Sequence, residues 1–138
     1  MKYWIVTLPR EDLEHCMRIG VLGFNSKQRL GSIEDGDRIL CCATREKPWK
    51  IIGIGTVSAS LYIDDKPVFK NPGGYWYRVN FKAELFLKEN EIDFQERVGA
   101  LSFVKNLVYW PVYFKGGIKE LNLEDWNQLS SKIPEENL

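Results

Sequence analysis

Hydrophobic and polar positions along the chain mostly form short strand-type runs. Strands are expected at residues 3–7, 38–44, 50–58 and 75–87, and residues 21–24 form a further short strand or an extended loop. The longest run has the clearest pattern, because apolar and aromatic residues alternate with polar ones, as in a strand with one face in water. Residues 38–44 are almost continuously apolar, which predicts a strand that is covered on both faces.

Helix-type patterns occur at residues 9–19 and 123–132. Pro9 suits a first helical turn, acidic residues follow it, and Gly20 is placed to end the helix. Asn122 is placed to cap the second helix, with an acidic residue three positions later. The expected buried stripes are Leu13, Cys16 and Met17 in the first helix and Trp126, Leu129 and Ile133 in the second.

The remaining segments are shorter and less regular. Turns are expected at residues 35–36, 71–74 and 116–117, a short helix at 94–100 and an extended segment at 109–114. Gly53 and Gly55 lie on one face of the strand at 50–58, which indicates a bulge or the close approach of another backbone or a ligand.

These elements predict an α+β fold that is mainly β. Five or more strands with helices only at the edges suit a small, closed or nearly closed barrel. The sequence has no alternating strand–helix rhythm and no glycine-rich phosphate-binding motif, so folds that bind nucleotide cofactors are disfavoured.

Length and composition predict one globular domain over residues 1–138. The chain is 44% hydrophobic and 28% charged, as in ordinary globular proteins. No apolar run approaches the roughly 18 residues of a membrane span, and the charged residues after Pro9 interrupt a signal peptide. We therefore expect a soluble, cytoplasmic protein.

Charge is balanced overall but unevenly distributed. The formal net charge is zero, with 19 basic and 19 acidic residues. Basic residues predominate between positions 26 and 82, and acidic residues predominate after position 82. A neutral total disfavours a protein that coats DNA through many phosphate contacts, but it leaves room for a local basic face.

Thiol and imidazole chemistry has little support. Cys16, Cys41 and Cys42 include no C-x-x-C motif, and adjacent residues on a strand point to opposite faces. His15 is the sole histidine and lies beside Cys16 on the expected helix, where neighbours diverge by about 100°. We expect buried, reduced thiols, no metal site and no cofactor.

Short motifs follow one another in a defined order along the chain. They are Tyr3-Trp4, Val21-Leu22-Gly23-Phe24, Gly36-Asp37, Ile51-Ile52-Gly53-Ile54-Gly55, Tyr62-x-Asp64 and Leu101-x-Phe103-Val104-Lys105-Asn106 running to Trp110. This ordered set resembles the EVE domain, a PUA-like barrel related to the YTH and ASCH domains. This resemblance spans nearly the whole chain and implies a PUA-like small mixed β-barrel with short peripheral helices.

The resemblance also implies a non-catalytic module that binds nucleic acid, either DNA or RNA, and holds a flipped, modified base. It places the base pocket at Trp4, Leu22, Gly23, Phe24, Asn25, Cys42, Thr44 and Trp110. Leu22 occupies the position of an expected tryptophan wall, so Trp4, Phe24 and Trp110 are the candidates for the aromatic surface. Basic residues expected in or near the rim loops are Lys27, Arg29, Arg45, Lys47 and Lys105.

Two other functions remain open. The related ASCH barrels include enzymes, and a nuclease or amidohydrolase would require Glu34, Asp64 and Lys105 to converge in the pocket. A module that senses a small ligand or binds a protein is the other alternative. The reader hypothesis requires an open, ring-lined cavity, and it fails if the chain's own side chains fill the opening with Trp4 and Trp110 sealed inside.

Overall fold

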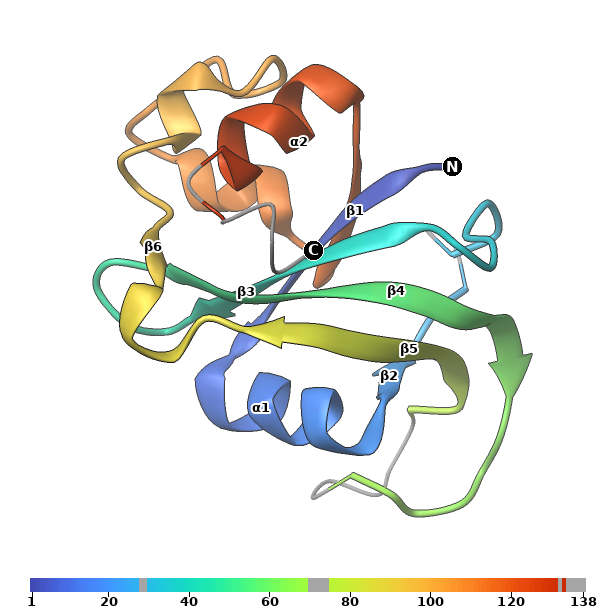
Figure 1. Ribbon diagram of the computed structural model, residues 1–138. Coiled ribbons are helices and arrows are strands. Elements are labelled where there is room, and N and C mark those ends of the chain that lie inside the picture. The colour runs from blue at the N-terminus through green and yellow to red at the C-terminus, as the bar shows by residue number, and fades with distance from the viewer. Residues whose placement is uncertain (28–29, 70–74, 132, 134–138) are drawn as a thin grey trace.

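A curled, mixed β-sheet forms the body of the protein (Figure 1). The computed structural model describes residues 1–27, 30–69, 75–131 and 133. Within these residues the strands are β1 (Tyr3–Pro9), β2 (Val21–Phe24), β3 (Arg38–Thr44), β4 (Lys50–Ile63), β5 (Tyr77–Phe86), β6 (Ile92–Asp93) and β7 (Ile118–Leu121). Their order is β2-β5-β4-β3-β1-β7, with β6 paired to β4. The β1–β3 pair is parallel and the others are antiparallel.

Short helices lie on both sides of the sheet (Figure 1). The α-helices described are α1 (Arg10–Ile19) and α2 (Leu123–Ser130), and the 3-10 helices are η1 (Lys88–Asn90), η2 (Val98–Ala100) and η3 (Trp110–Phe114). In Figure 1, α1 lies below the sheet, whereas α2 and the segment that carries η2 and η3 lie above it. The prediction of a mainly β fold with peripheral helices is confirmed.

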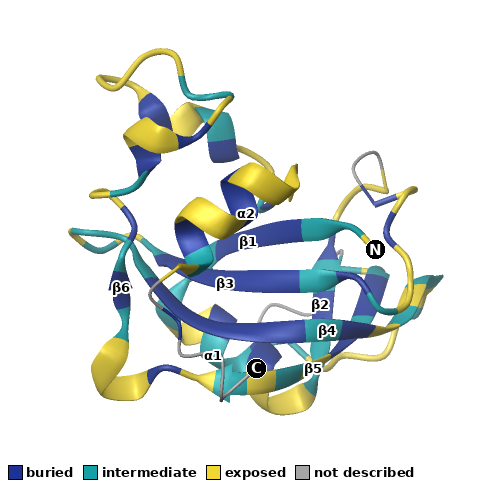
Figure 2. Cartoon of the chain, turned by 45° about the horizontal axis from the view of Figure 1, so that its top comes forward, coloured by how far each residue is buried: buried dark blue, intermediate teal, exposed yellow. Residues whose placement is uncertain are grey.

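Buried side chains form a hydrophobic core on each face of the sheet. Ile39 and Cys41 of β3 belong to the core that includes the buried stripe of α1. Leu40 and Cys42 point the other way, into the core that includes the buried residues of α2 and η3. Figure 2 shows β3 buried along most of its length. The prediction that this strand is covered on both faces is therefore confirmed.

The ends of both helices follow the predicted chemistry. Gly20 adopts a left-handed conformation, with φ of 73°, and its N–H donates to the Cys16 carbonyl at 2.8 Å. The Asn122 side chain accepts a 2.7 Å hydrogen bond from the backbone N–H of Asp125. The predicted helix at 123–132 ends at Ser130, and Lys132 lies outside the described residues.

We expect Asn122→Ala to lower the free energy of unfolding by about 1 kcal/mol, because a first-turn N–H of α2 then loses its cap. Urea denaturation of the two proteins measures this difference. Asn127→Ala is the matched control, since Asn127 is exposed within α2 and alanine has the higher helix propensity. An equal loss of stability in both variants would contradict the capping role.

Several element boundaries differ from the sequence predictions. The segment expected to be extended at 109–114 is the 3-10 helix η3, because Pro111 suits a first helical turn and Trp110 and Phe114 both pack into the core on the α2 side. The helix expected at 94–100 is reduced to η2. β4 continues to Ile63 and pairs there with the start of β5. The turn predicted at 71–74 lies outside the described residues.

Arg78 departs from the predicted water-exposed face of β5. Its side chain is buried, and its guanidinium donates to the carbonyls of Tyr75 and Lys66. Asp64 lies 3.9 Å from the same guanidinium. A buried cation is retained where several oxygen atoms surround it, and alternation along a strand does not reveal such partners.

Candidate functional site

An open groove lies at the carboxyl ends of the parallel strands β1 and β3. Adjoining hollows of about 650 and 470 Å³ share Thr7 and residues 115–117 as a common border. The larger hollow extends to Phe24, Asn25 and Tyr75, and the smaller one extends to Thr44, Arg45, Trp49 and Val112. Each volume lies within the roughly 300–1,000 Å³ that is typical of ligand pockets.

A glycine turn forms the border between the hollows. Gly116 and Gly117 have φ values of 101° and 83°, which side chains other than glycine rarely adopt. The N–H of Thr7 donates to the Gly117 carbonyl at 2.9 Å, and the Thr7 hydroxyl donates to the Phe114 carbonyl at 3.3 Å. These bonds fix the turn against the end of β1, so backbone lines the middle of the groove.

Aromatic rings border the groove from both sides. Tyr75 lines the larger hollow together with Phe24, which is 7% exposed and packs in the core on the α1 side, and Trp49 lines the smaller hollow. Trp49 is half-buried, and its ring meets Trp110 edge-on with ring centroids 4.7 Å apart. It also lies nearly parallel to Phe94 at 6.0 Å. The underlying rings therefore hold Trp49 in a fixed orientation.

Four of the eight predicted pocket residues line this groove. Gly23, Phe24 and Asn25 border the larger hollow, and Thr44 borders the smaller one. Gly23 has space only for a hydrogen, because a Cβ there would lie 2.5 Å from the Phe69 ring. The segment after the first helix therefore reaches the groove as the resemblance implies.

The other four predicted pocket residues belong to the hydrophobic cores and are not among the groove's lining residues, so the structure does not bring them into the groove. Trp4 is 2% exposed, and its indole N–H donates to Asp37 at 3.0 Å. Leu22 packs in the same core on the α1 side. Cys42 faces the opposite core, and Trp110, 9% exposed, lies beneath Trp49. Trp4 and Trp110 are thus buried on different faces of the sheet, and neither is among the residues that line the open groove.

Trp49 and Tyr75 are groove residues that the sequence does not predict. For Trp49 one signal is available, because it follows the loop that carries Arg45 and Lys47, just after the strand at 38–44. Tyr75 is predicted only as a member of the alternating strand, although β5 begins two residues later. No local pattern distinguishes Tyr75 from a core aromatic.

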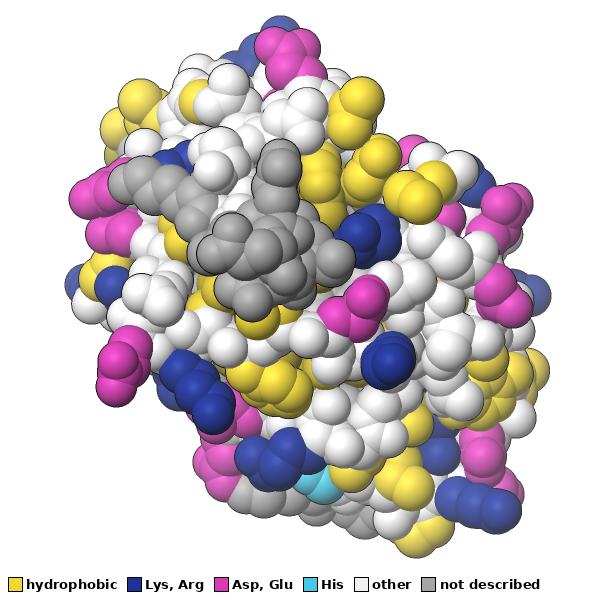
Figure 3. Space-filling view, viewed as in Figure 1, with side chains coloured by type: hydrophobic (Ala, Val, Ile, Leu, Met, Phe, Trp, Pro, Cys, Tyr) yellow, Lys and Arg dark blue, Asp and Glu magenta, His cyan; other side chains and the backbone are white. Residues whose placement is uncertain are grey.

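The charge along the groove is basic. Among the predicted rim cations, Arg45 lines it, and Lys115 joins Arg45 there, whereas the described lining includes no acidic residue. Lys27, Lys47 and Lys105 are exposed but are not among the lining residues, and Arg29 lies outside the described part of the chain. Elsewhere the signs mix, as on the face drawn in Figure 3.

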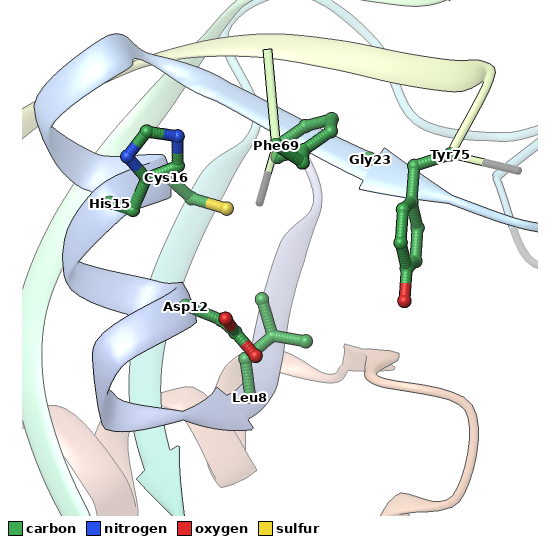
Figure 4. Close-up of a pocket in the computed structure, with 7 residues that line it drawn as sticks. All are labelled: Leu8, Asp12, His15, Cys16, Gly23, Phe69 and Tyr75. Carbon is green, nitrogen blue, oxygen red and sulfur yellow. The ribbon is translucent and has the colours of Figure 1, made fainter. Parts of the chain in front are cut away.

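A smaller hollow of about 70 Å³ opens between α1 and residues that precede β5 (Figure 4). Asp12, His15, Cys16 and Phe69 line it, and the His15 ring lies 2.7 Å from the Val68 carbonyl through Nε2. This space is well below the volume of ordinary ligand pockets. We therefore interpret it as a packing gap behind the groove.

The two candidate catalytic carboxylates have different partners. Glu34 pairs with Lys2 at 3.6 Å, and Asp64 lies 3.9 Å from Arg78. Glu34, Asp64 and Lys105 are not among the residues that line the groove. In the described part of the chain, histidine, cysteine and acidic side chains form no cluster of three that could hold a metal ion.

The three thiols are free and buried. Burial, with a contribution from Asp12, raises the pKa of Cys16 to about 12, and burial next to Cys16 raises the pKa of Cys41 to about 12. Burial likewise raises the pKa of Cys42. Because the thiolate is the nucleophile, these cysteines are suited to packing and not to catalysis.

No helix among the described residues is long and apolar enough to span a membrane.

Comparisons with solved structures identify the fold. Human THYN1 in complex with DNA containing 5-methylcytosine has a TM-score of 0.63 at 13% identity, covering 98% of this chain and 99% of that one. A mutant of the ZmASCH protein from Zymomonas mobilis has a TM-score of 0.63 at 14% identity, covering 96% and 99%. At these identities the likeness shows the fold alone, and the fold is PUA-like.

Sequence comparisons give closer relationships. No protein-family model matches the chain. UPF0310 protein PYRAB08750 of Pyrococcus abyssi is 25% identical, covering 96% of this chain and 100% of the relative. UPF0310 protein PH1033 of Pyrococcus horikoshii is 34% identical over 147 residues, covering 96% of this chain and 99% of the relative. A match of this extent places the chain in the UPF0310 family.

Proposed function

We propose that the protein is a non-catalytic, EVE-type module that binds nucleic acid and holds an extruded, modified base in the groove. The observation that carries this proposal is the groove itself, which is bordered by Phe24, Tyr75 and Trp49 and lined by Arg45 and Lys115. The structural likeness to THYN1, which was crystallised with 5-methylcytosine DNA, supports the same function.

The free energies of the expected contacts are consistent with a protein that recognises a modified base. Stacking of a base on an aromatic ring contributes about 1–3 kcal/mol, and extruding a base from a duplex costs a few kcal/mol. Phosphate contacts from Arg45 and Lys115 would supply further affinity. An apolar niche for an added methyl group discriminates by only ~1–3 kcal/mol, so we expect modest selectivity.

The walls of this pocket are not those that the resemblance implies. Trp4 and Trp110 are buried in the cores, and Tyr75 and Trp49 border the groove instead. In this proposal, specificity depends on Tyr75 and Trp49, which lie outside the motifs of the resemblance, together with Gly23 and Phe24 within them.

A panel of labelled oligonucleotides tests the proposal at a stated salt concentration. It contains unmodified, 5-methylcytosine, 5-hydroxymethylcytosine and N6-methyladenine strands. We expect Tyr75→Ala to weaken binding of the preferred modified oligonucleotide about tenfold, through the loss of one stacking surface.

Arg45→Ala should weaken the binding of all oligonucleotides alike, and it should reduce by about one the slope of the logarithm of the binding constant against the logarithm of the salt concentration.

Lys82→Ala is the matched control for Arg45→Ala, because Lys82 is exposed in the middle of β5 and is not among the groove residues. Circular dichroism of each variant separates lost binding from lost folding. Absence of binding to every oligonucleotide by the wild-type protein would remove the proposal. Turnover of RNA or of acylated nucleosides would instead support an ASCH-type enzyme, and tight binding of a free small molecule alone would support a ligand sensor.

A further inference from the structure

Exposed apolar side chains stand beside the groove, where the chain enters η3. Val108, Tyr109 and Val112 are 77%, 68% and 60% exposed, and we refer to these three residues as the apolar ridge. Exposed apolar side chains gathered in this way usually mark an interaction surface.

Leu107 is excluded from the ridge although it is 61% exposed. Its side chain leans on η2, since a Cβ built on Gly99 would lie 3.5 Å from its Cδ2 atom. Leu107 therefore already has a packing partner.

The ridge is continuous with the groove. Val112 lines the smaller hollow, and its N–H donates to the Tyr109 carbonyl at 3.1 Å. Tyr109 is the residue that precedes η3, one position before Trp110. A ligand that fills the hollow beside Trp49 therefore contacts the ridge at Val112, with Tyr109 and Val108 next to it along the chain.

Hydrogen bonds hold the loop that presents the ridge. The N–H of Val108 donates to the Asn106 side chain at 2.9 Å, and the N–H of Lys105 donates to the Tyr113 hydroxyl at 3.2 Å. Nearer its start, Ser102 donates to the buried carboxylate of Asp125 through its N–H at 2.8 Å and its hydroxyl at 2.6 Å. A surface ordered in advance loses less conformational entropy on binding.

We propose that the ridge packs against the base pairs that flank the extruded nucleotide, with Tyr109 entering the stack as a wedge, so that the preferred partner is double-stranded. This inference rests on the proposed function. Extrusion of a base exposes the faces of its neighbours, and apolar side chains that enter such a step stabilise the opened duplex. The neighbouring cations Arg45 and Lys115 suit a phosphate backbone better than an apolar protein partner.

A comparison of duplex and single strand tests this proposal. Both oligonucleotides carry the same single 5-methylcytosine, and affinities are measured at one salt concentration for the wild type, Tyr109→Ala and Ile63→Ala. Ile63 is the control, because it is 72% exposed at the far end of β4 and is not among the groove residues. We expect Tyr109→Ala to weaken duplex binding about tenfold and single-strand binding less than about twofold. Ile63→Ala should match the wild type on both.

A fluorescent 2-aminopurine next to the modified base gives a second readout, because its emission rises when the stack opens. The wild type should raise this emission in the duplex, and Tyr109→Ala should raise it less at saturating protein. Equal losses on both strands, or no loss on either, would overturn the wedge while leaving the base pocket in place. A wild-type dimer that Tyr109→Ala converts to a monomer would show that the ridge is a protein interface. If the wild type binds no oligonucleotide, the proposed function fails and the wedge fails with it.

Discussion

Replacement of Asp37 by alanine is expected to lower the free energy of unfolding by about 3–5 kcal/mol. The carboxylate is 1% exposed and accepts hydrogen bonds from the indole N–H of Trp4 at 3.0 Å and from the backbone N–H groups of Lys2 and Glu34, each at 2.9 Å. Alanine leaves these donors without their acceptor, and the Trp4 indole is fully enclosed. Buried donors without partners cost about 1–3 kcal/mol each. Chemical denaturation measures the difference.

The same carboxylate makes stability depend on pH. Burial by itself would raise the pKa of Asp37, but the hydrogen bonds from Lys2, Trp4 and Glu34 and the charge of Lys2 outweigh it and lower the pKa below its ordinary value. A lowered pKa in the folded state means that this contribution is complete above about pH 4, the unfolded pKa, and declines as pH falls through the folded value. Asp37→Asn should therefore show a weaker loss of stability below about pH 4 than the wild type.

Asp65→Ala is the matched control, because Asp65 is an exposed carboxylate in the loop after β4. It should change stability by less than about 0.5 kcal/mol. If Asp37→Ala proved as stable as Asp65→Ala, the hydrogen bonds that Asp37 accepts from Trp4 and from the neighbouring backbone would contribute little to stability.

Replacement of Gly55 by alanine is expected to cost about 3 kcal/mol, the second large effect. A Cβ at this position would lie 2.7 Å from the Lys82 carbonyl oxygen and 2.7 Å from the buried Phe81 ring. The pairing of β4 with β5 also shifts register between Ile54 and Gly55, so the strands cannot separate there without disturbing the bulge. Overpacking of this kind typically costs about 1–3 kcal/mol, and a rigid backbone neighbour places this case at the upper end. Thermal and urea unfolding measure the cost.

Gly31→Ala is the matched control for this substitution. A Cβ at Gly31 would meet nothing within 4 Å, and its φ lies outside the left-handed region. Alanine should therefore leave the stability unchanged or raise it slightly, by reducing the freedom of the unfolded chain. Similar losses in both variants would indicate a general intolerance of alanine, and the close approach at Gly55 would then not explain the result.

The substitutions at Asp37 and Gly55 change residues of the motifs on which the EVE resemblance rests, and the structure explains why those residues are needed. Gly36-Asp37 provides the buried carboxylate that binds Trp4 of the opening motif, and Gly53 and Gly55 provide the space that β5 requires. The motifs that support the resemblance thus stabilise the sheet, whereas the exposed rings of the groove lie outside them.

Periodicity determined the helices and most of the strands, because the buried face of each element depends on local spacing. The continuous apolar run at β3 predicts a strand covered on both faces, and the core clusters agree with it. The alternation before Leu87 holds only in part: Val79 and Phe81 pack on the α1 side, whereas Leu87 packs on the α2 side, beyond the register shift between β4 and β5. Caps at Gly20 and Asn122 were equally local, since each depends on one residue and its own helix.

Tertiary structure alone decided which aromatic rings face the groove. Trp4, Trp49 and Trp110 are chemically alike, and each lies in or beside an apolar segment, yet only Trp49 reaches the groove lining. Their exposure depends on contacts between segments far apart in the chain, such as Trp4 with Asp37 and Trp49 with Trp110. The sequence by itself therefore determined the mainly β fold and its caps, whereas packing between distant segments determined the walls of the site, because a side chain's burial is set by what covers it and not by its own chemistry.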